Sequence, residues 1–422
     1  MAHKLNKDPS VVRNRIYYGV LAFLLMFGIL SASIFFYLQN EKPVERIVKI
    51  GVLSPISGFM SGHGASINMG AAIAVEKINK EGGILGHQVK VILLDTKSDP
   101  PVAAERTREL IGRNQVDLII GTGTSAETLA AIPDSEKSHT PFLYSLDGEA
   151  KTCMPNDNTS VAHWIWGTGF TERMVVKPLL ETLAHHFVKN RRAIKIYFIG
   201  GDYVYPRTTN AYAKDVATSL GYSVVGDEYS DTSTQDYAPV IRRIETAKPD
   251  ILIVTNPGES GVAFMRQARQ MGLHKKLLIS GFATFDQEAL DAMGDASEGV
   301  YCVNRYSRRI QSPANAEFLS LFRTKYPTAS TLPGPTAAAG AYGAILVAKA
   351  AFDKAGTLDR DAFARAMDNL EVVLPQGTIR VSEKNHIFEQ PIYVMQIRGG
   401  EYEIIDVIDH AMHPDLEGCS VH

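Results

Sequence analysis

Cysteine is scarce in this sequence, with three residues in 422. So few cysteines exclude the disulfide-rich class of small secreted scaffolds. Cys302 lies in the strand-like run GVYCV and is predicted to be a buried small hydrophobic residue. Cys153 and Cys419 remain available for a bridge in an oxidising compartment, and the sequence leaves their state open.

An excess of basic charge is also missing. The formal net charge is −3, and residues 1–16 contain four Lys or Arg against one Asp, so the remainder carries −6. An acidic body of this kind argues against a nucleic-acid partner. Hydrophobic residues at 45% and charged residues at 21% indicate a globular protein long enough for two or three domains.

The motifs of common enzymes and metal sites are absent. The sequence contains no G-x-S-x-G, H-E-x-x-H, Walker A or C-x-x-C. Residues 121–126, GTGTSA, fit a dinucleotide pattern, but they follow the third predicted strand of their unit rather than the first. We therefore predict no catalytic residues, no metal and no cofactor. The alternative from another class is an exported amide hydrolase with Asp147 or Glu149 as its base.

One long apolar run lies near the N-terminus. Residues 17–38 carry no formal charge, and a helix of that length spans about 33 Å, enough to cross a bilayer. Positive charge precedes the run, which predicts a cytoplasmic tail at 1–16, a membrane anchor at 17–38, a linker at 39–46 and an exported body. The alternative is a signal peptide cleaved at Ser31–Ser33, but the run exceeds a usual signal-peptide core.

The body alternates between predicted strands and helices. A glycine-rich loop is expected after the first strand, with a helix from 67 to 81 behind it. Strands are predicted at 47–53, 89–94, 116–120, 141–144, 223–225, 251–255, 277–281, 378–381, 392–397 and 402–407. A further strand is predicted from 194 to the glycines at 200 and 201, where the backbone is expected to turn sharply. This order indicates an α/β fold with two successive doubly wound units and parallel sheets.

The stretch 194–210, IKIYFIGGDYVYPRTTN, is the strongest single signal for a site. A buried strand ends at Gly200 and Gly201, and Tyr203 and Tyr205 follow directly. Ligands of open α/β sheets bind at the carboxyl ends of strands, and tyrosines offer both an apolar face and a hydroxyl.

Polar loops also follow the other predicted strands, and each could be ordinary surface or a helix cap. The residues of interest in these loops are Ser57, Met60, His63, Thr124, Ser125, Tyr144, Ser145, Asp147, Glu149, Glu259 and Ser260. Together they predict a ligand site between two lobes.

Four motifs give the chain a family resemblance. They are INKEGGILGHQVKVILLDTKSDPPVAAERTRELI at 78–111, GGDYVYPRTTN at 200–210, NPGESGVAF at 256–264 and PQGTIRV at 375–381. Over 48–409 the chain resembles type I periplasmic solute-binding proteins of ABC importers, in the branched-chain amino acid, urea and short-chain amide group. The motifs are most similar to the urea and amide subgroup.

The resemblance implies two Rossmann-like lobes joined by three crossovers, near 165–170, 295–302 and 370–375. Lobe 1 would comprise 47–167 with 300–372, and lobe 2 would comprise 168–299 with 373–410, leaving a tail at 411–422. It also implies an extracytoplasmic location, held at the cytoplasmic membrane by the N-terminal helix. ABC permease and ATPase subunits would be the partners.

The family's binding residues map onto both lobes of this sequence, and His63 joins them from the first loop. The predicted ligand-binding residues are His63, Ser125, Tyr144, Ser145, Asp147, Tyr203, Tyr205, Glu259, Ser260 and Tyr306.

The sequence departs from the urea pattern at Asp147 and Gly148, where that subgroup carries glutamine and tyrosine. A carboxylate in place of an amide favours a ligand that presents N–H groups or a cation. Cys153 matches a cysteine common in the subgroup, and the resemblance implies that it pairs with Cys419.

The sequence thus predicts a membrane-anchored solute-binding protein that captures a small polar nitrogenous compound, such as urea or a short-chain amide. The alternatives are a branched-chain amino acid binding protein and a sensor that passes its signal to a partner.

Overall fold

The structure is a computed structural model that describes Met26, Gly28 and residues 46–145, 163–187, 194–327 and 336–412. Contacts divide the chain into two units, 1–46 and 47–422. Among the described residues, none of the helices has the length and apolar character needed to span a membrane. The predicted anchor at 17–38 lies outside the described residues apart from Met26 and Gly28, and it stays a prediction.

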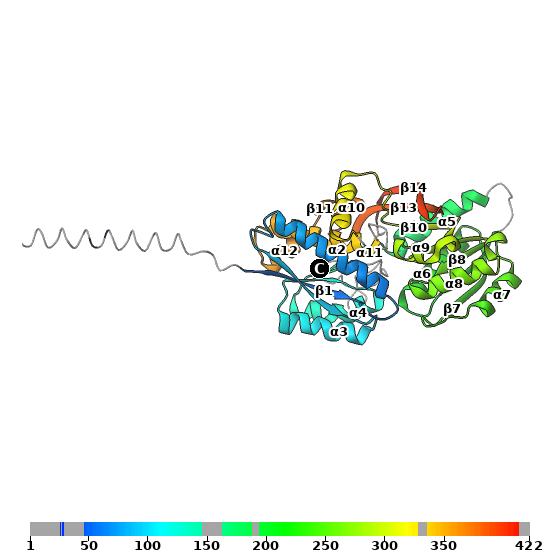
Figure 1. Cartoon of the computed structure of the whole chain (residues 1–422), viewed down its shortest axis with the longest axis horizontal. Helices are drawn as coiled ribbons and strands as arrows, with labels where there is room; N and C mark the ends of the chain where they lie inside the picture. The colour runs from blue at the N-terminus through cyan, green and yellow to red at the C-terminus, as the bar shows by residue number, and fades with distance from the viewer. Residues whose placement is uncertain are drawn as a thin grey trace, which may run out of the picture. The chain divides into compact units, whose positions relative to one another are not determined.

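The 47–422 unit contains two sheets, each with its own helices (Figure 1). The first sheet is entirely parallel and has the order β2-β1-β3-β4-β5. Its strands are β1 (Val48–Ser54), β2 (Val89–Asp95), β3 (Leu118–Gly121), β4 (Phe142–Tyr144) and β5 (Ile165–Gly167). Its helices are α2 (Ser61–Lys80), α3 (Pro100–Glu109), α4 (Ser125–Ser138), α10 (Pro313–Lys325), α11 (Thr336–Ala355) and α12 (Arg360–Met367), with a π-turn at Leu110–Asn114. We call this sheet with these helices lobe 1.

The second sheet runs β11-β12-β13-β10-β9-β8-β6-β7, with β14 paired to β13. Its strands are β6 (Lys195–Gly201), β7 (Ser223–Ser230), β8 (Ile251–Thr255), β9 (Leu278–Phe282), β10 (Tyr301–Asn304), β11 (Glu371–Leu374), β12 (Gly377–Val381), β13 (Phe388–Arg398) and β14 (Glu401–Ala411). Its helices are α5 (Glu172–Phe187), α6 (Val204–Ser219), α7 (Ala238–Ala247), α8 (Glu259–Gln270) and α9 (Gln287–Met293), with 3₁₀ turns at Leu273–Lys275 and Gly294–Ser297. We call this sheet with these helices lobe 2. The α/β fold with parallel sheets is confirmed.

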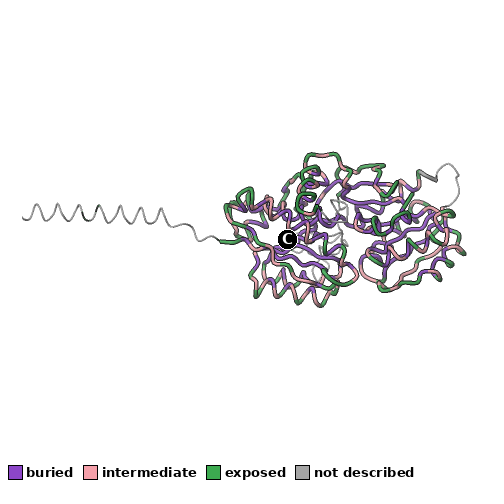
Figure 2. The backbone as a smooth tube through the Cα atoms, viewed as in Figure 1, coloured by how far each residue is buried: buried purple, intermediate pink, exposed green. Residues whose placement is uncertain are grey.

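Strands β1, β3, β4, β5, β6 and β8 are largely buried, whereas β2, β7, β11 and β14 contain many exposed or half-buried residues (Figure 2). In lobe 1, α2 and α11 pack together although they are far apart in the sequence (Figure 1). Gly70 allows this approach, because a Cβ there would lie 2.1 Å from the carbonyl oxygen of Ala338. Cys302 is buried and free, which confirms its predicted role, whereas Cys153 and Cys419 lie outside the described residues.

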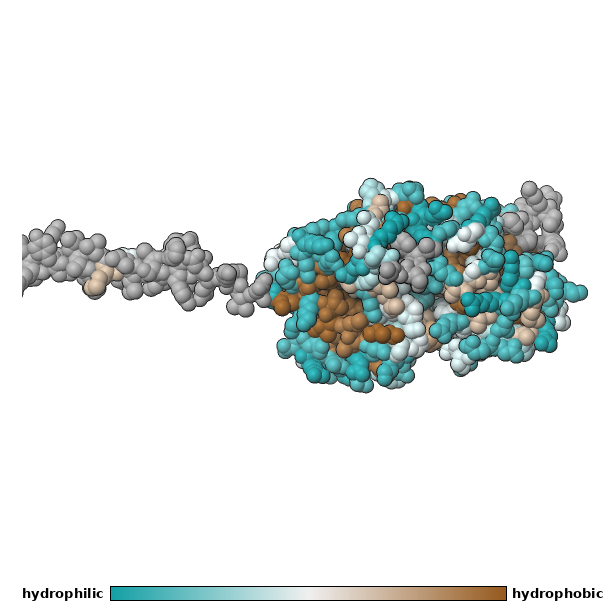
Figure 3. All heavy atoms as spheres, in the orientation of Figure 1, coloured by the Kyte–Doolittle hydropathy of each residue, from teal (hydrophilic) through white to brown (hydrophobic). Residues whose placement is uncertain are grey.

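On the face that Figure 3 shows, the described surface is mainly hydrophilic, with an apolar area on lobe 1 near β1. Strand β2 is an edge strand of the lobe 1 sheet, and its Leu93 is exposed. No register shift interrupts its pairing with β1. Edges of this kind are surfaces at which other chains can pair.

Helix α2 begins at Ser61, six residues before its predicted start at Ile67. The prediction failed because two glycines, Gly62 and Gly64, indicated a loop. Gly64 is instead required by packing, since a Cβ there would lie 2.0 Å from the carbonyl oxygen of Pro55. His63 therefore lies on a helix rather than in a loop.

Two passages between the lobes, after β5 and after β10, meet a residue of β13 at one carbonyl group, that of Thr168. Arg305, after β10, donates through its guanidinium to the carbonyl oxygens of Thr168 (3.1 Å) and Ser145 (2.6 Å). Gln390 of β13 donates to the carbonyl oxygens of Thr168 (3.3 Å) and Gly169 (2.9 Å). The segments after β5, after β10 and around β13 are thereby tied together.

We expect Arg305→Met to lower the free energy of unfolding by about 2–4 kcal/mol, because it removes the guanidinium donors to the buried carbonyl oxygens of Ser145 and Thr168, of which Thr168 keeps only Gln390. Urea unfolding of the full chain measures this. Arg365→Met, at an exposed position of α12, is the matched control and should change little. Equal midpoints for the two variants would show that the buried guanidinium does not stabilise the junction.

Candidate functional site

A small cavity lies where the carboxyl ends of strands from both lobes face each other. It measures about 30 Å³. It is lined by Met60, His63, Gly123, Thr124 and Ser125 of lobe 1 and by Tyr203, Tyr205, Pro257, Ala283 and Asp286 of lobe 2.

A larger depression of about 510 Å³ lies elsewhere, at the amino ends of β8, β9 and β10. We take the smaller cavity as the candidate site, because ligands of open α/β sheets bind at the carboxyl ends of strands and between domains.

On the lobe 1 side, the cavity is bounded by the N-terminus of α4. Thr124 is the N-cap residue, and its hydroxyl oxygen accepts from the backbone N–H of Glu127 at 3.2 Å. The same hydroxyl donates to a carboxylate oxygen of Glu127 at 2.9 Å. The Glu127 carboxylate also accepts from the backbone N–H of Thr124, which completes a capping box. Ser125 is therefore the first residue of the helix, not its cap.

Glu127 is fully buried. Burial raises the pKa of its carboxyl group above the ordinary value, and hydrogen bonds from the side chains of Thr96 and Thr124 and from the backbone of Thr124 and Gly123 oppose that rise.

On the lobe 2 side, the two tyrosines follow β6. Tyr203 is the N-cap residue of α6 and Tyr205 is buried in its first turn. Burial raises the pKa of Tyr203, with smaller contributions from Asp286 and Glu127, so its hydroxyl stays protonated. Gly200 and Gly201 belong to the strand rather than to a turn. Gly201 is needed because a Cβ would lie 2.8 Å from the ring of Tyr203.

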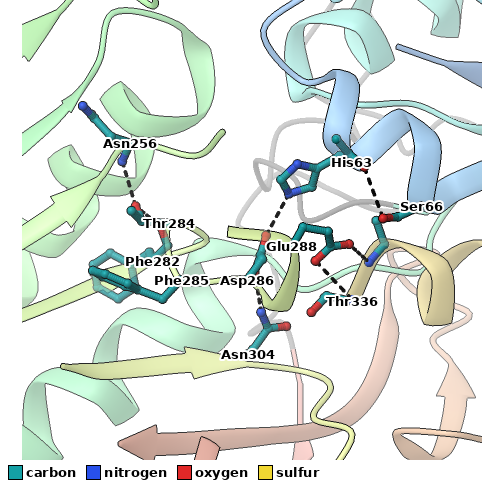
Figure 4. A network of polar contacts seen from close by, with 12 residues as sticks. His63, Ser66, Asn256, Phe282, Thr284, Phe285, Asp286, Glu288, Asn304 and Thr336 are labelled. Atoms are coloured by element: carbon teal, nitrogen blue, oxygen red, sulfur yellow. Dashed lines mark hydrogen bonds and ion pairs between the residues drawn. The ribbon is translucent and has the colours of Figure 1, made fainter. Parts of the chain in front are cut away.

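Polar side chains connect the two lobes beside the cavity (Figure 4). His63 of α2 lies with Nε2 3.1 Å from a carboxylate oxygen of Asp286, which precedes α9. Asn304 of β10 donates to the other oxygen at 2.6 Å. Both members of the His63–Asp286 pair are buried, so it forms only when the lobes are in contact.

A second connection is made by Glu288 of α9, whose carboxylate lies at the N-terminus of α11 (Figure 4). It accepts from the backbone N–H groups of Ala337 at 2.8 Å and of Thr336 at 3.3 Å. A carboxylate of lobe 2 thus satisfies first-turn donors of a lobe 1 helix and interacts favourably with its dipole. Burial raises the pKa of Glu288, an effect that His63 opposes and Asp286 strengthens.

Four of the predicted site residues line the cavity, namely His63, Ser125, Tyr203 and Tyr205. Ser145 and Tyr144 are buried, and Tyr144 packs so closely on β5 that a Cβ at Gly167 would lie 2.1 Å from its hydroxyl oxygen.

The remaining predictions have other surroundings. Tyr306 donates to Asn315 at 2.9 Å and packs against Phe318 in the core of lobe 1. Glu259 and Ser260 begin α8 and are not among the residues that line the cavity. Asp147 lies outside the described residues.

Sequence reasoning missed Asp286 and Glu288. Both follow strand β9 in the run GFATFDQEAL, so the rule that selected the other loops could also have selected them.

Comparison with known proteins gives consistent matches. The family model described as "Periplasmic binding protein" matches residues 47–401. Leu/Ile/Val-binding protein homolog 7 of Brucella suis biovar 1 (strain 1330) is 24% identical over 303 residues, covering 71% of this chain and 75% of that protein. Homolog 8 of Brucella abortus (strain 2308) is 26% identical over 296 residues, covering 66% and 70%.

Solved structures share the fold. A solute binding protein of an ABC transporter from Rhodopseudomonas palustris BisB5, in complex with 3,4-dihydroxybenzoic acid, has a TM-score of 0.79 at 24% identity and covers 87% of this chain and 99% of its own. A branched-chain amino acid transporter substrate binding protein from Streptococcus pneumoniae, in complex with isoleucine, has a TM-score of 0.71 at 22% identity and covers 86% and 100%.

We expect Glu288→Ala to shift the full chain toward an open form, because the acceptor for the first-turn N–H groups of α11 is lost. The shift should be about 1–2 kcal/mol. Distances between spin labels on α3 and α7 report it without a ligand. Glu298→Ala is the matched control, since Glu298 also accepts from a backbone N–H, that of Gly399 at 2.8 Å, but within lobe 2. Unchanged distance distributions in Glu288→Ala would show that this contact does not hold the lobes together.

The pH should act on closure through the same residue. Because the pKa of Glu288 is raised in the closed form, that form binds the proton more tightly than an open form with a hydrated carboxyl group. The contribution of Glu288 to the stability of the closed form is fully present below the ordinary carboxyl pKa. It is lost as the pH rises through the raised pKa of Glu288 in the closed form. The same labels should record a falling closed population over that window, and Glu288→Gln should flatten the curve. The charges of His63 and Asp286 act on the same carboxyl group.

Proposed function

The chain belongs to the periplasmic binding protein family, and on that premise we propose that it captures a small polar nitrogenous solute between its two lobes for an ABC importer. The observation that carries this proposal is the cavity lined from both lobes, beside contacts that form only when the lobes meet. A solute bound there would touch both lobes and favour the closed form, which is the state a membrane partner would recognise.

The lining supports a ligand that presents N–H groups. Asp286 contributes a carboxylate, and Ser125, Tyr203 and Tyr205 contribute hydroxyls, all of which accept hydrogen bonds. Urea, short-chain amides and guanidinium-like compounds have N–H groups that can donate to these acceptors. The role is binding without turnover.

A branched-chain amino acid is the second candidate. The matched relatives are named as Leu/Ile/Val-binding homologues, and one structural neighbour holds isoleucine. The N-terminus of α4 at the cavity favours this candidate, because helix N-termini attract carboxylates.

We further propose an extracytoplasmic location with residues 17–38 as the membrane anchor and permease and ATPase subunits as partners. Anchoring would raise the effective concentration of the protein near its transporter, so moderate affinity would suffice. The alternative is a receptor subunit that signals the presence of the ligand to a partner protein.

A thermal-shift screen of the full chain against urea, short amides, guanidine and branched-chain amino acids tests the ligand class. A ligand at 100 times its dissociation constant should stabilise the chain by about 2.7 kcal/mol. The ligand should also shorten the distance between the spin labels on the two lobes. Asp286→Asn should weaken both responses, whereas Asp295→Asn, outside the cavity, should not.

Stabilisation by amino acids alone would establish the second candidate. Stabilisation without any change in the label distances would contradict capture by lobe closure.

A further inference from the structure

Strand β2 lies at the edge of the lobe 1 sheet, and one of its sides faces no other described strand. The backbone N–H and C=O groups of one strand residue point to the same side, and successive residues alternate. The carbonyl oxygen of Gln88 accepts from the backbone N–H of Val48 at 2.8 Å, so Gln88 faces β1. The even-numbered residues of β2 therefore bond to β1, and the odd-numbered residues direct their backbone groups outward.

Both ends of this outward side are already occupied. The side chain of Asn79 accepts from the backbone N–H of Val89 at 2.8 Å and donates to its carbonyl oxygen at 2.9 Å, which confirms that Val89 faces outward. At the other end, the Asp95 carboxylate accepts from the backbone N–H groups of Ser57 at 3.2 Å and of Lys97 at 2.9 Å. The open part of the edge thus lies between these ends and consists of the backbone groups of Val91 and Leu93.

The side chains along the open part are apolar. Leu93 is 38% exposed, and Val91 on the same face is half-buried against the core of lobe 1. Ile92 and Leu94, on the opposite face, are also half-buried. The apolar area near β1 in Figure 3 agrees with this composition. A regular, uncovered and apolar edge is a surface on which another strand can pair.

The charges on β2 favour an antiparallel partner of the same sequence. Lys90 is exposed near the amino end of the strand, and Asp95 is at its carboxyl end. Two antiparallel copies of β2 bring Lys90 of one copy beside Asp95 of the other at both ends of the pair. An in-register parallel arrangement would instead bring like charges together, which is unfavourable.

We propose that two copies of this chain pair through their β2 edges, antiparallel about a two-fold axis at Ile92, so that the two lobe 1 sheets become one. A two-fold axis requires the same patch on both copies to be complementary to itself, and the open part of β2 meets that requirement. Val91 of each copy lies opposite Leu93 of the other, and each such pair exchanges both of its N–H···O bonds. The apolar side chains of each pair pack together on one face of the joined sheet.

Oligomeric state is the first test. Native mass spectrometry of the full chain over a concentration series should show a dimer whose share rises with concentration. Leu93→Lys places a charge in the pairing edge, and Leu93→Pro removes an outward N–H that β1 does not use, so each should weaken dimerisation by about tenfold or more. Val373→Lys is the matched control, because Val373 is exposed on β11, an edge strand of lobe 2, and it should leave dimerisation unchanged.

Disulfide trapping tests the register. Ile92→Cys places two thiols opposite each other at a non-hydrogen-bonded position, where Cα atoms are about 4.5 Å apart, within the range of a disulfide. Lys90→Cys is the control, since the two copies of residue 90 lie about 14 Å apart in this register. Under mild oxidation, Ile92→Cys should form a reducible covalent dimer, whereas Lys90→Cys and the unsubstituted chain should not.

The inference is overturned if the full chain stays monomeric throughout the series or if both folded Leu93 variants dimerise as tightly as the unsubstituted chain. It is also overturned if Ile92→Cys forms no more covalent dimer than Lys90→Cys. A monomeric chain whose β2 edge pairs only with a different protein falls under the first of these outcomes. None of the results bears on solute capture between the lobes, which the thermal-shift and spin-label measurements test separately.

Discussion

The carbonyl group of Thr168 is the point on which the arrangement of the two lobes depends. It accepts from Arg305, which follows β10, and from Gln390 of β13, so three separate passages of the chain meet at one acceptor. Burying a guanidinium costs several kcal/mol unless its donors are satisfied, and the carbonyl oxygens of Thr168 and Ser145 accept from two of its nitrogen atoms here. Because the passages are tied together, a change in lobe orientation has to involve them as a group.

Among the described residues, the lobes contact each other through a few specific interactions rather than a broad apolar surface. The rings of Phe59 and Tyr203 pack edge to face with centroids 5.5 Å apart. Gly258 lies against the carbonyl oxygen of Phe59, 2.8 Å from where its Cβ would be, and its φ of +77° also requires glycine. With the His63–Asp286 pair, these contacts are sensitive to small displacements. A difference of a few kcal/mol between open and closed forms suits a protein whose ligand must shift that balance.

The sequence was sufficient to predict the fold class, because strands with buried hydrophobic runs alternate with helices, and that periodicity is local. It also selected four residues that line the cavity, His63, Ser125, Tyr203 and Tyr205, since polar residues after parallel strands gather at one sheet edge. That they bind a ligand stays a prediction. The pairing of His63 with Asp286 could not be predicted from the sequence, because 223 residues separate them and only the packed lobes bring them together. The early start of α2 was missed for a similar reason, since Gly64 is explained by the nearby Pro55 carbonyl and not by a turn.

Two helices of lobe 1, α4 and α11, meet carboxylates at their N-termini, but the carboxylates come from different places. Glu127 belongs to α4 itself, so its bonds to the N-cap residue Thr124 do not depend on whether the lobes are open or closed. The donors of α11 are satisfied by Glu288 of lobe 2, and they would be released to water if the lobes separated. Closure therefore supplies the first-turn N–H groups of α11 with acceptors that come from the other lobe, which couples the end of this helix to the position of the lobes.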